Sequence, residues 1–447
     1  MIISTPNGPH LMNWTCLLII IIFFIILGLL IGEKMPRAYL AVLGAVLMIV
    51  FGVFDIQEAI QFVNWETIGF LWGAFLLIEI LIEAGFFNWA ALLLARQLNY
   101  QPVKIFIFFP LFAFFLSAFL NSLTVMIFLS VVTFQLAKLL KFDPAPVIVT
   151  EVVLANIGGA STLVGDPPNV ILGTGLGFGF NEFVLHNGPA AVVSALAALT
   201  VSYFLNRRTL PGRRQQPDEK TIQEIRSQAT ITDGYLLRLG LTGLAAMLIF
   251  LIGRPLLVQG GFPVSISMAS LLPAFLILAL GGPRVYKHHF MRKVDSETLI
   301  FFIGLFVIVG ALEKRFIIQA TASWLVNAFR TPFLFLSSLF WGVGTISGFV
   351  DNVPLAMTMT SLIKQGIGET HQLAAALLVW TVSLGVDLGG NLTPIGASAN
   401  VVAYGYLQRN AVSINWKRWL QLAFVPSLTA LFISYSAILL KMHLRFY

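Results

Sequence analysis

GGASTLVGDPPNV (158–170) stands inside a long apolar segment, and GGNLTPIGASANV (389–401) repeats its outline at an offset of 231 residues, from 158 to 389. Glycine pairs and prolines interrupt helices, because glycine is conformationally free and proline lacks an amide donor. The glycines, a threonine and an asparagine recur in the same register in both copies. The repeat therefore predicts two broken helices built to one plan.

The composition indicates where these segments lie. The chain has 447 residues, of which 58% are hydrophobic and 11% charged, and its mean hydropathy is +0.88. Soluble proteins carry about 25% charged residues, whereas apolar runs of about 20 residues are typical of membrane spans. We therefore expect an all-α polytopic membrane protein whose main partner is the lipid bilayer.

The apolar segments predict about ten spans and two re-entrant hairpins. The segments 104–140 and 331–366 exceed one span and carry a polar tip midway, which indicates hairpins that enter and leave on one side. Two spans, 145–180 and 373–406, contain the breaks. The other predicted spans are 15–32, 38–54, 67–85, 187–206, 235–257, 265–282, 298–314 and 417–440.

The two halves of the chain correspond to each other. The hairpin tips SAFLNSLT (117–124) and SGFVDNVP (347–354) match at an offset of 230, from 117 to 347. Each half has an odd number of spans, so the second half is expected to be inverted in the membrane. Inverted repeats with broken helices are typical of secondary transporters. We predict a first inverted repeat over 1–206, a cytoplasmic linker over 207–234 and a second inverted repeat over 235–447.

Basic residues set the expected orientation. Most of the 27 Lys and Arg fall in loops that are cytoplasmic if the N-terminus lies outside, and Lys34 and Arg37 belong to one such loop. We therefore expect a multi-pass protein of the cell membrane with its N-terminus outside. The net charge of +7 follows from this loop bias and does not indicate nucleic-acid binding.

Neutral polar side chains gather at the breaks and hairpin tips. Irregular backbone at membrane depth occurs where it lines a cavity, and the ends of half-helices suit anions, polar solutes or cations. Close helix packing alone also requires small residues, but two copies in register beside polar tips favour a binding site. We predict that substrate and coupling ion bind to Asn121, Ser122, Thr124, Ser161, Thr162, Asn169, Asn352, Thr393, Ser398 and Asn400.

Acidic residues differ between the two halves. Asp351 on the second tip corresponds to Asn121 on the first, and Asp166 in the first break corresponds to Ala397. Asp387 precedes the second break. Ionisable groups inside spans are costly and mark functional sites. These three acids are therefore predicted to serve the coupling ion, which is H⁺ or Na⁺.

Two further assignments concern ions. Asp351 and Asn352 are the candidates for a Na⁺ site, while Glu151, before the first break, is a candidate proton relay or equally a structural partner of a hydroxyl. No basic residue falls inside a break or a tip, which disfavours tight binding of a multivalent carboxylate. No other cofactor is expected.

The paired segments resemble those of the ArsB/NhaD/P-protein permeases of the ion transporter superfamily, which also contains citrate-type transporters and dicarboxylate/sodium symporters. DNVPLAMTM (351–359) is similar to that family's second hairpin motif, and the similarity extends from about residue 37 to 440. The resemblance implies two inverted repeats, a site between tips and breaks, and a homodimer. Many relatives have Asp-Asn at both tips, so Asn121-Ser122 here favours Asp351 as the coupling residue.

The expected function is an ion-coupled secondary active transporter of a small inorganic solute. DLGGNLTPIG (387–396) is similar to the arsenite-permease version of the second break, which favours arsenite- or antimonite-like export by alternating access. Na⁺/H⁺ antiport, transport of anions or di- and tricarboxylates, and a channel are the alternatives. An enzyme is not expected, because HExxH, GxGD and GxxxxGK[ST] motifs are absent. A separate ATPase subunit is not indicated.

Overall fold

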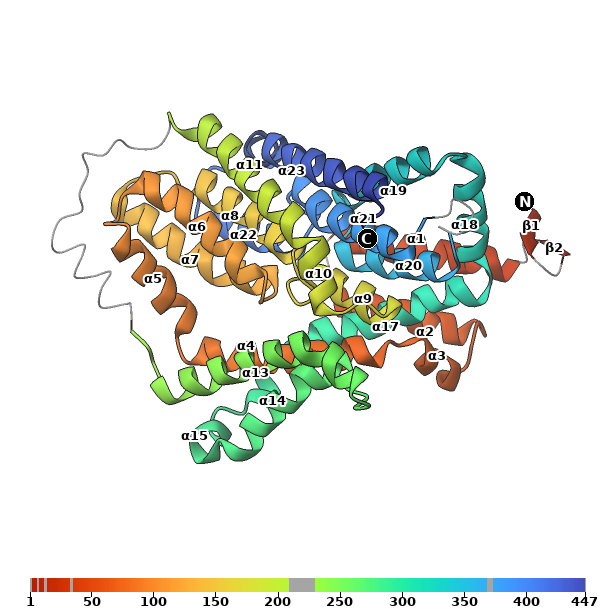
Figure 1. Ribbon diagram of the computed structural model, residues 1–447, viewed down its shortest axis with the longest axis horizontal. Helices are drawn as coiled ribbons and strands as arrows, with labels where there is room; N and C mark the ends of the chain where they lie inside the picture. Colours follow the sequence, from red (N-terminus) through yellow and green to blue (C-terminus); the bar gives the residue numbers. More distant parts are fainter. Residues whose placement is uncertain are drawn as a thin grey trace.

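Two broken helices pack against each other at the centre of the structure, a computed structural model that describes residues 2–5, 8–11, 14–32, 35–208, 230–367 and 373–446. Figure 1 shows an elongated molecule with α6 and α7 toward one end and α18 to α20 toward the other. Most of the predicted linker lies outside the described residues.

The first half begins with two short antiparallel strands, which the sequence pattern did not predict. They are β1 (Ile2–Thr5) and β2 (Gly8–Leu11). The helices that follow are α1 (Trp14–Gly32), α2 (Arg37–Val50), α3 (Ile56–Phe62), α4 (Trp65–Glu83), α5 (Phe86–Gln97), α6 (Pro102–Ser117), α7 (Ser122–Leu140), α8 (Pro144–Gly159), α9 (Pro167–Leu176), α10 (Phe180–His186) and α11 (Gly188–Asn206).

The second half repeats this order of long helices, hairpin and broken helix. Its helices are α13 (Gly234–Gln259), α14 (Ile266–Leu280), α15 (Gly282–Tyr286), α16 (Phe290–Lys293), α17 (Ser296–Lys314), α18 (Ile317–Ala328), α19 (Pro332–Ser347), α20 (Asn352–Lys364), α21 (Ala375–Gly389), the 3₁₀ turn η2 (Gly390–Leu392), α22 (Ser398–Arg409) and α23 (Trp416–Leu444).

The lengths and composition of these helices confirm the predicted class. Within the described residues, eight helices are long and apolar enough to cross a membrane, or nine if α14 and the helices after its 113° bend form one span. The predicted number of about ten includes helices that are individually too short, such as α2 with 14 residues and α8 with 16. Both predicted breaks are present, between α8 and α9 and between α21 and α22.

The two halves interlock through exchanged contacts. Helix α2 of the first half packs on α17 of the second, and α14 of the second half packs on α4 of the first. In the same way α7 packs on α22, and α20 packs on α9. Each hairpin therefore places one arm against the other half's broken helix. Inversion of the halves across a bilayer stays a prediction.

The glycine pairs let each hairpin approach its own broken helix. A Cβ atom on Gly158 would lie 2.2 Å from the carbonyl oxygen of Phe114 in α6. The same atom on Gly389 would lie 2.2 Å from the carbonyl oxygen of Gly344 in α19. Real Cβ atoms do not approach backbone so closely, so both positions require glycine for space.

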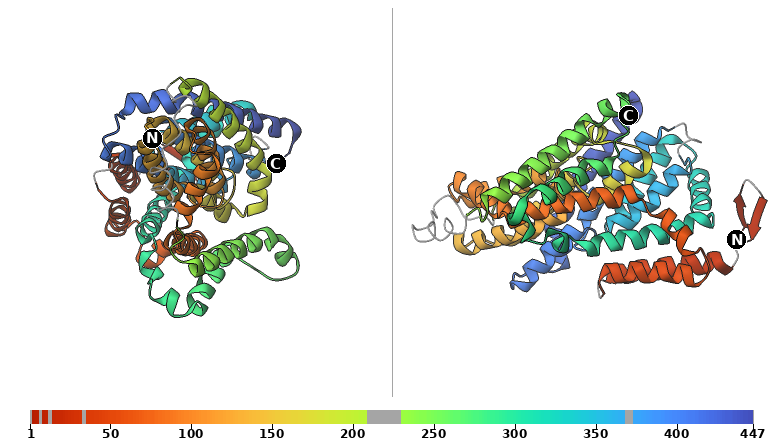
Figure 2. Two further views of the ribbon diagram at one scale, coloured as in Figure 1. Left: turned by 90° about the vertical axis from the view of Figure 1, so that its left-hand side faces the viewer. Right: turned by 90° about the horizontal axis from the view of Figure 1, so that it is seen from below.

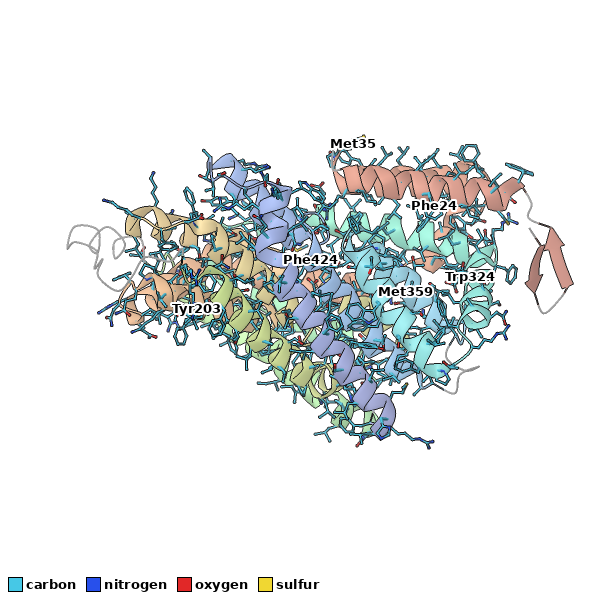
Figure 3. All side chains as sticks on the ribbon, turned by 90° about the horizontal axis from the view of Figure 1, so that it is seen from above. Phe24, Met35, Tyr203, Trp324, Met359 and Phe424 are labelled. Carbon is cyan, nitrogen blue, oxygen red and sulfur yellow. The ribbon has the colours of Figure 1, made fainter. Side chains whose placement is uncertain are left out.

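The outer helices present apolar side chains to the surroundings. Helix α1 lies along one edge of the molecule, with the two strands beyond its start (Figure 2). Phe24 on α1 is 62% exposed and Phe424 on α23 is 45% exposed, and both lie on the outside in Figure 3. Such surfaces suit contact with hydrocarbon, because lipid tails are as apolar as these side chains.

Candidate functional site

A cleft of about 690 Å³ lies where the hairpin tips meet the breaks. Both tips and both breaks contribute to its walls, together with the first turns of α2 and α17. The lining residues that carry polar groups are Arg37, Asn121, Ser122, Asp166, Asp295, Glu297, Thr298, Asp351, Asn352, Ser398 and Arg409. Six of the predicted site residues therefore line this cleft: Asn121, Ser122, Asp166, Asp351, Asn352 and Ser398.

Arg37 is a cleft residue that the sequence pattern did not indicate. It is the first residue of α2, and its Nη1 donates hydrogen bonds of 2.6 Å to Asp351 Oδ2 and of 2.6 Å to Ser398 Oγ. Its charge led us to place it in a cytoplasmic loop, and no basic residue stands inside a break or a tip, yet folding brings the guanidinium of Arg37 to the second tip. The proline before it marks a helix start, but its partners lie more than 300 residues away.

Asp351 binds the guanidinium of Arg37 and also caps the start of α20. Its Oδ1 accepts the amide hydrogen of Val353 at 3.0 Å and so caps α20, while its Oδ2 pairs with Arg37 at 2.6 Å. Arg37 therefore occupies the place expected for Na⁺, and two cations side by side repel each other. Among the described residues, no group of three or more His, Cys, Asp or Glu is arranged to hold a metal ion.

Asp166 precedes α9 without capping it. Pro167 and Pro168 lack amide hydrogens, the amide of Asn169 donates to the backbone carbonyl oxygen of Asp166 at 3.1 Å, and the structure shows no side-chain capping bond. Asp166 Oδ1 instead accepts a 2.8 Å hydrogen bond from Ser122 Oγ on the first tip. The double proline thus keeps this carboxylate available to the cleft.

The two halves make the same contact with exchanged partners. In the first half the hairpin tip supplies the hydroxyl of Ser122 and the break supplies the carboxylate of Asp166. In the second half the tip supplies the carboxylate of Asp351 and the break supplies the hydroxyl of Ser398, which donates at 3.2 Å. This exchange explains why the acid stands in the break in the first half and on the hairpin tip in the second half.

Asn169 and Asn400 each donate hydrogen bonds to carbonyl oxygens of their own break. Asn169 Nδ2 donates to the carbonyl oxygens of Gly159 (3.0 Å) and Thr162 (2.9 Å), and Asn400 Nδ2 donates to those of Gly390 (2.8 Å) and Thr393 (2.7 Å). Both asparagines are fully buried and neither lines the cleft. The structure therefore places them in support of the breaks.

The threonines of the breaks anchor the hairpin tips. Thr162 Oγ1 donates to the carbonyl oxygen of Ala118 at 2.5 Å, and Thr393 Oγ1 donates to that of Gly348. Ser161 Oγ donates to the carbonyl oxygen of Gly158 within its own break. These hydroxyls satisfy backbone acceptors that hydrocarbon would leave without a donor.

The remaining predicted residues lie behind the cleft or away from it. Thr124 is a half-buried residue of α7 that does not line the cleft. Glu151 is fully buried, and its Oε1 accepts a 2.6 Å hydrogen bond from Thr133 in α7. This contact supports the structural role of Glu151; a role as a proton relay stays a prediction. Asp387 is fully buried beside Asp166 and Asn169.

Buried amides also connect the two breaks. Asn156 Nδ2 donates at 2.8 Å to Asn391 Oδ1 and at 2.8 Å to Asn400 Oδ1. Ser383 in α21 donates at 2.6 Å to Asn169 Oδ1. These buried hydrogen bonds join the two broken helices, so a shift of one against the other would have to break them.

Known proteins of related sequence are described as transporters. A sequence model of the family described as citrate transporter matches residues 27–385. An uncharacterized transporter of Mycobacterium tuberculosis is 30% identical over 399 residues, which cover 87% of this chain and 90% of the relative. The P protein of Homo sapiens is 27% identical over 478 residues, which cover 89% of this chain and 56% of that protein.

Two solved structures share the fold. MtrF of Neisseria gonorrhoeae, described within a class of antimetabolite efflux pumps, has a TM-score of 0.59 and 13% identity over 97% of this chain and 95% of that chain. The YdaH transporter of Alcanivorax borkumensis, described as having an unusual topology, has a TM-score of 0.55 and 13% identity over 97% and 99%. At this identity the likeness concerns the fold alone.

Proposed function

The chain belongs to the citrate transporter family, and from that premise we propose that it is an ion-coupled secondary active transporter of small organic anions such as carboxylates. The match to the P protein confirms the resemblance to the P-protein permeases. Relatives described as transporters support transport across a membrane as the activity, rather than catalysis. The observation that carries the choice of an anion is the position of Arg37 in the cleft.

Arg37 offers a fork of donors that fits a carboxylate. Its side chain is 26% exposed, and charge-assisted bonds from arginine to carboxylates are about twice as strong as neutral ones. Asp351 now accepts from Arg37, so an incoming carboxylate would take the place of Asp351 on the same donor. Substrate binding would thereby release the second hairpin tip from α2.

Helix termini add positive potential to the same cleft. Five described helices, α2, α7, α9, α20 and α22, begin at residues that line it. Each helix start carries a partial positive charge of about +0.5, which favours an anion nearby. The cleft therefore suits a small anion despite the acids in its walls.

The cleft is open at one end of the site. At the other end, the helices that correspond to its walls are in contact. Thr67 Oγ1 and Thr174 Oγ1 lie 2.6 Å apart, and Asn64 Nδ2 donates to Thr174 Oγ1 at 3.1 Å. Thr298, the counterpart of Thr67, instead lines the open cleft. One open and one closed end is the arrangement expected of alternating access, and it supports a carrier over a channel.

Other predicted functions and partners stay predictions. Export of arsenite or antimonite finds less support in the site, because a neutral solute makes no use of the charge of Arg37. The chain's one cysteine, Cys16, is buried in α1 and does not line the cleft. Na⁺/H⁺ antiport is a further alternative. We also propose a homodimer in the cell membrane with its N-terminus outside.

The test is exchange of citrate by the purified protein in proteoliposomes. Vesicles loaded with unlabelled citrate are diluted into labelled citrate, with protein-free vesicles as the control. We expect label uptake that succinate and other carboxylates inhibit and that arsenite does not. Absence of exchange for every carboxylate, together with flux of arsenite or of Na⁺ against H⁺, would overturn the proposal.

A further inference from the structure

A basic segment between α14 and α17 lies outside the cleft and bends sharply away from α14. Residues 281–293, GGPRVYKHHFMRK, contain four Lys and Arg and no Asp or Glu. We call this segment the basic elbow. It includes α15 and α16, which follow α14 after a bend of 113°. In Figure 1, α15 lies near the start of α13.

The bend is fixed by the backbone and by buried side chains. Gly282 has a φ of +69°, a left-handed conformation that favours glycine, and a Cβ atom on Gly281 would lie 2.3 Å from a methyl group of Val285. Val285 and Phe290 are 1% and 2% exposed and anchor the two short helices. At about 1.5 Å of rise per helical residue, residues 284–292 span about 12 Å. The elbow is therefore a compact, defined surface.

The outward side chains of the elbow combine apolar groups with cations. Tyr286 is 53% exposed and Met291 is 50% exposed, while Leu280 at the end of α14 is 78% exposed. A chain that leaves a span with a bend of 113° runs close to the plane of the membrane surface. Apolar and aromatic side chains beside Lys and Arg are typical of the boundary between hydrocarbon and headgroups.

Three cations of the elbow form no ion pair with any described carboxylate. Arg284, Lys287 and Arg292 are exposed, and the ion pairs of the described residues do not include them. Lys293, by contrast, pairs with Glu83 of α4 at 2.5 Å. Three charges within one short segment are thus available to an external anion.

The start of α13 adds a fourth cation to this surface. The guanidinium of Arg284 lies over the ring of Tyr235 in α13, 5.7 Å from its centroid. Arg238 follows Tyr235 by three residues, so the two side chains are neighbours on the helix surface. Arg238 is exposed, and its guanidinium donates to a backbone carbonyl oxygen four residues back.

The acids near the elbow are engaged in capping helices. Asp233 interacts with Arg284 and Lys287 at longer range, but its Oδ1 accepts hydrogen bonds from the first amides of α13. Asp295, the next acid along the chain, accepts hydrogen bonds from the amide and the hydroxyl of Thr298. The positive charge of the elbow is therefore only partly compensated.

We propose that the basic elbow, together with Arg238, binds the headgroups of anionic phospholipids such as phosphatidylglycerol. Guanidinium and ammonium groups donate to the phosphate oxygens, while the acyl chains cover Tyr286 and Met291. A rule of loop charge requires only that cations are present. The bend, the buried anchors and the exposed apolar side chains place these cations at the level of the headgroups. This surface is separate from the cleft, so the inference goes beyond the proposed function and does not depend on the transported solute.

The first test measures which lipid contacts the elbow. In a background with Cys16→Ala, Met291→Cys is labelled with bimane, and dibrominated phosphatidylglycerol or phosphatidylcholine is added to the purified protein in neutral detergent. Bromine quenches a fluorophore that it contacts. Half-quenching should require about 10- to 100-fold less phosphatidylglycerol, and salt should reduce this preference because it screens exposed charges. Equal quenching by both lipids would overturn the proposal.

The second test removes the charges. R284Q/K287Q/R292Q should abolish the preference for phosphatidylglycerol, because each Lys or Arg contributes to the attraction. R284K/K287R/R292K keeps the charges and should retain the preference. The apparent melting temperature in detergent shows whether each variant is folded. A full preference in the folded glutamine variant would overturn the proposal.

Two controls separate the elbow from general charge and from free phosphate. R96Q/R207Q/R208Q neutralises three exposed arginines on α5 and at the end of α11, reaches the same net charge and should keep the preference. Its loss there to the same degree would show an effect of net charge and overturn the elbow as the site. Glycerol phosphate at constant ionic strength should leave quenching unchanged, and complete displacement of the lipid would overturn a lipid surface in favour of a phosphate site.

Discussion

At the scale of single residues, the proposed choice of an anion rests on Arg37 and Asp351. Their 2.6 Å ion pair joins the start of α2 to the tip of the second hairpin. The side chains are 26% and 11% exposed, so the pair is partly shielded from water. A buried charge that loses its partner raises the free energy of the protein. A carboxylate that competes with Asp351 for Arg37 therefore changes the energy of both members of the pair.

Substitutions of the two partners should act in opposite directions. R37Q removes a charge-assisted donor worth about 1.5–3 kcal/mol and should weaken citrate binding about 10- to 100-fold. D351N removes the carboxylate that competes with substrate for Arg37 and should strengthen binding. R37K keeps the charge without the fork and should give an intermediate affinity. The measurement is half-saturation of citrate exchange.

A matched control for these variants is R96Q, which changes an exposed arginine of α5. It should leave half-saturation unchanged. If R37Q and D351N both weakened binding to the same degree, the pair would be a structural link and the competition between substrate and Asp351 would be excluded.

At the scale of elements, each hairpin and its broken helix form one packed unit. Helix α6 lies on α8, and α19 lies on α21, through glycines that allow backbone contact. The break loops are then closed by side-chain donors from the same halves. The breaks are thus tied by side chains, because the carbonyl oxygens of Gly159, Thr162, Gly390 and Thr393 accept hydrogen bonds from buried amides.

Alanine at the contact glycines should therefore destabilise the protein. In G158A and G389A the added methyl would meet the backbone of Phe114 or Gly344 at 2.2 Å. Overpacking of this kind costs about 1–3 kcal/mol, so the apparent melting temperature in detergent should fall and exchange should be lost. G253A in α13 has no atom within 4 Å of its new methyl and should keep the wild-type melting temperature. Equal stability of all three variants would contradict the contact.

At the scale of the whole molecule, the two ends of the site differ, although the helices of the two halves pack in corresponding pairs. The cleft reaches the first turns of α2 and α17, while the contact between Thr67 and Thr174 is closed. The open end carries Arg37, which the loop charges place on the cytoplasmic side. The structure therefore corresponds to an inward-open carrier under the predicted orientation.

Labelling of single cysteines can test this arrangement. In a background with Cys16→Ala, the cleft residue Val402→Cys should react with a membrane-impermeant maleimide from the cytoplasmic side, in inside-out vesicles. Thr174→Cys at the closed contact should be protected from both sides. Reaction of Val402→Cys only in right-side-out vesicles would reverse the predicted orientation, and rapid reaction of Thr174→Cys from the outside would contradict the closed end.

Local patterns in the sequence determined the structural class of the protein and the positions of its apolar segments. The length of apolar runs, the glycines and prolines of 158–170 and the polar tips are properties of consecutive residues. They predicted both broken helices and the turns at both tips, while re-entry of the hairpins on one side stays a prediction. The amphipathic helices α5 and α18, with 12 residues each, escaped prediction because neither is long enough for a span. The same holds for the short helix α3 and the two strands.

Only the tertiary structure decided which side chains share the site. Asn169 and Asn400 were predicted to bind substrate, but hydrocarbon supplies no donors, so their amides serve the break carbonyls. Arg37 follows the loop charge rule in sequence, yet folding brings it to Asp351, 314 positions away. Sequence position determines which segments enter the membrane, because burial of apolar runs is a local property. Partnership between charges depends on packing of distant helices, which no local pattern encodes.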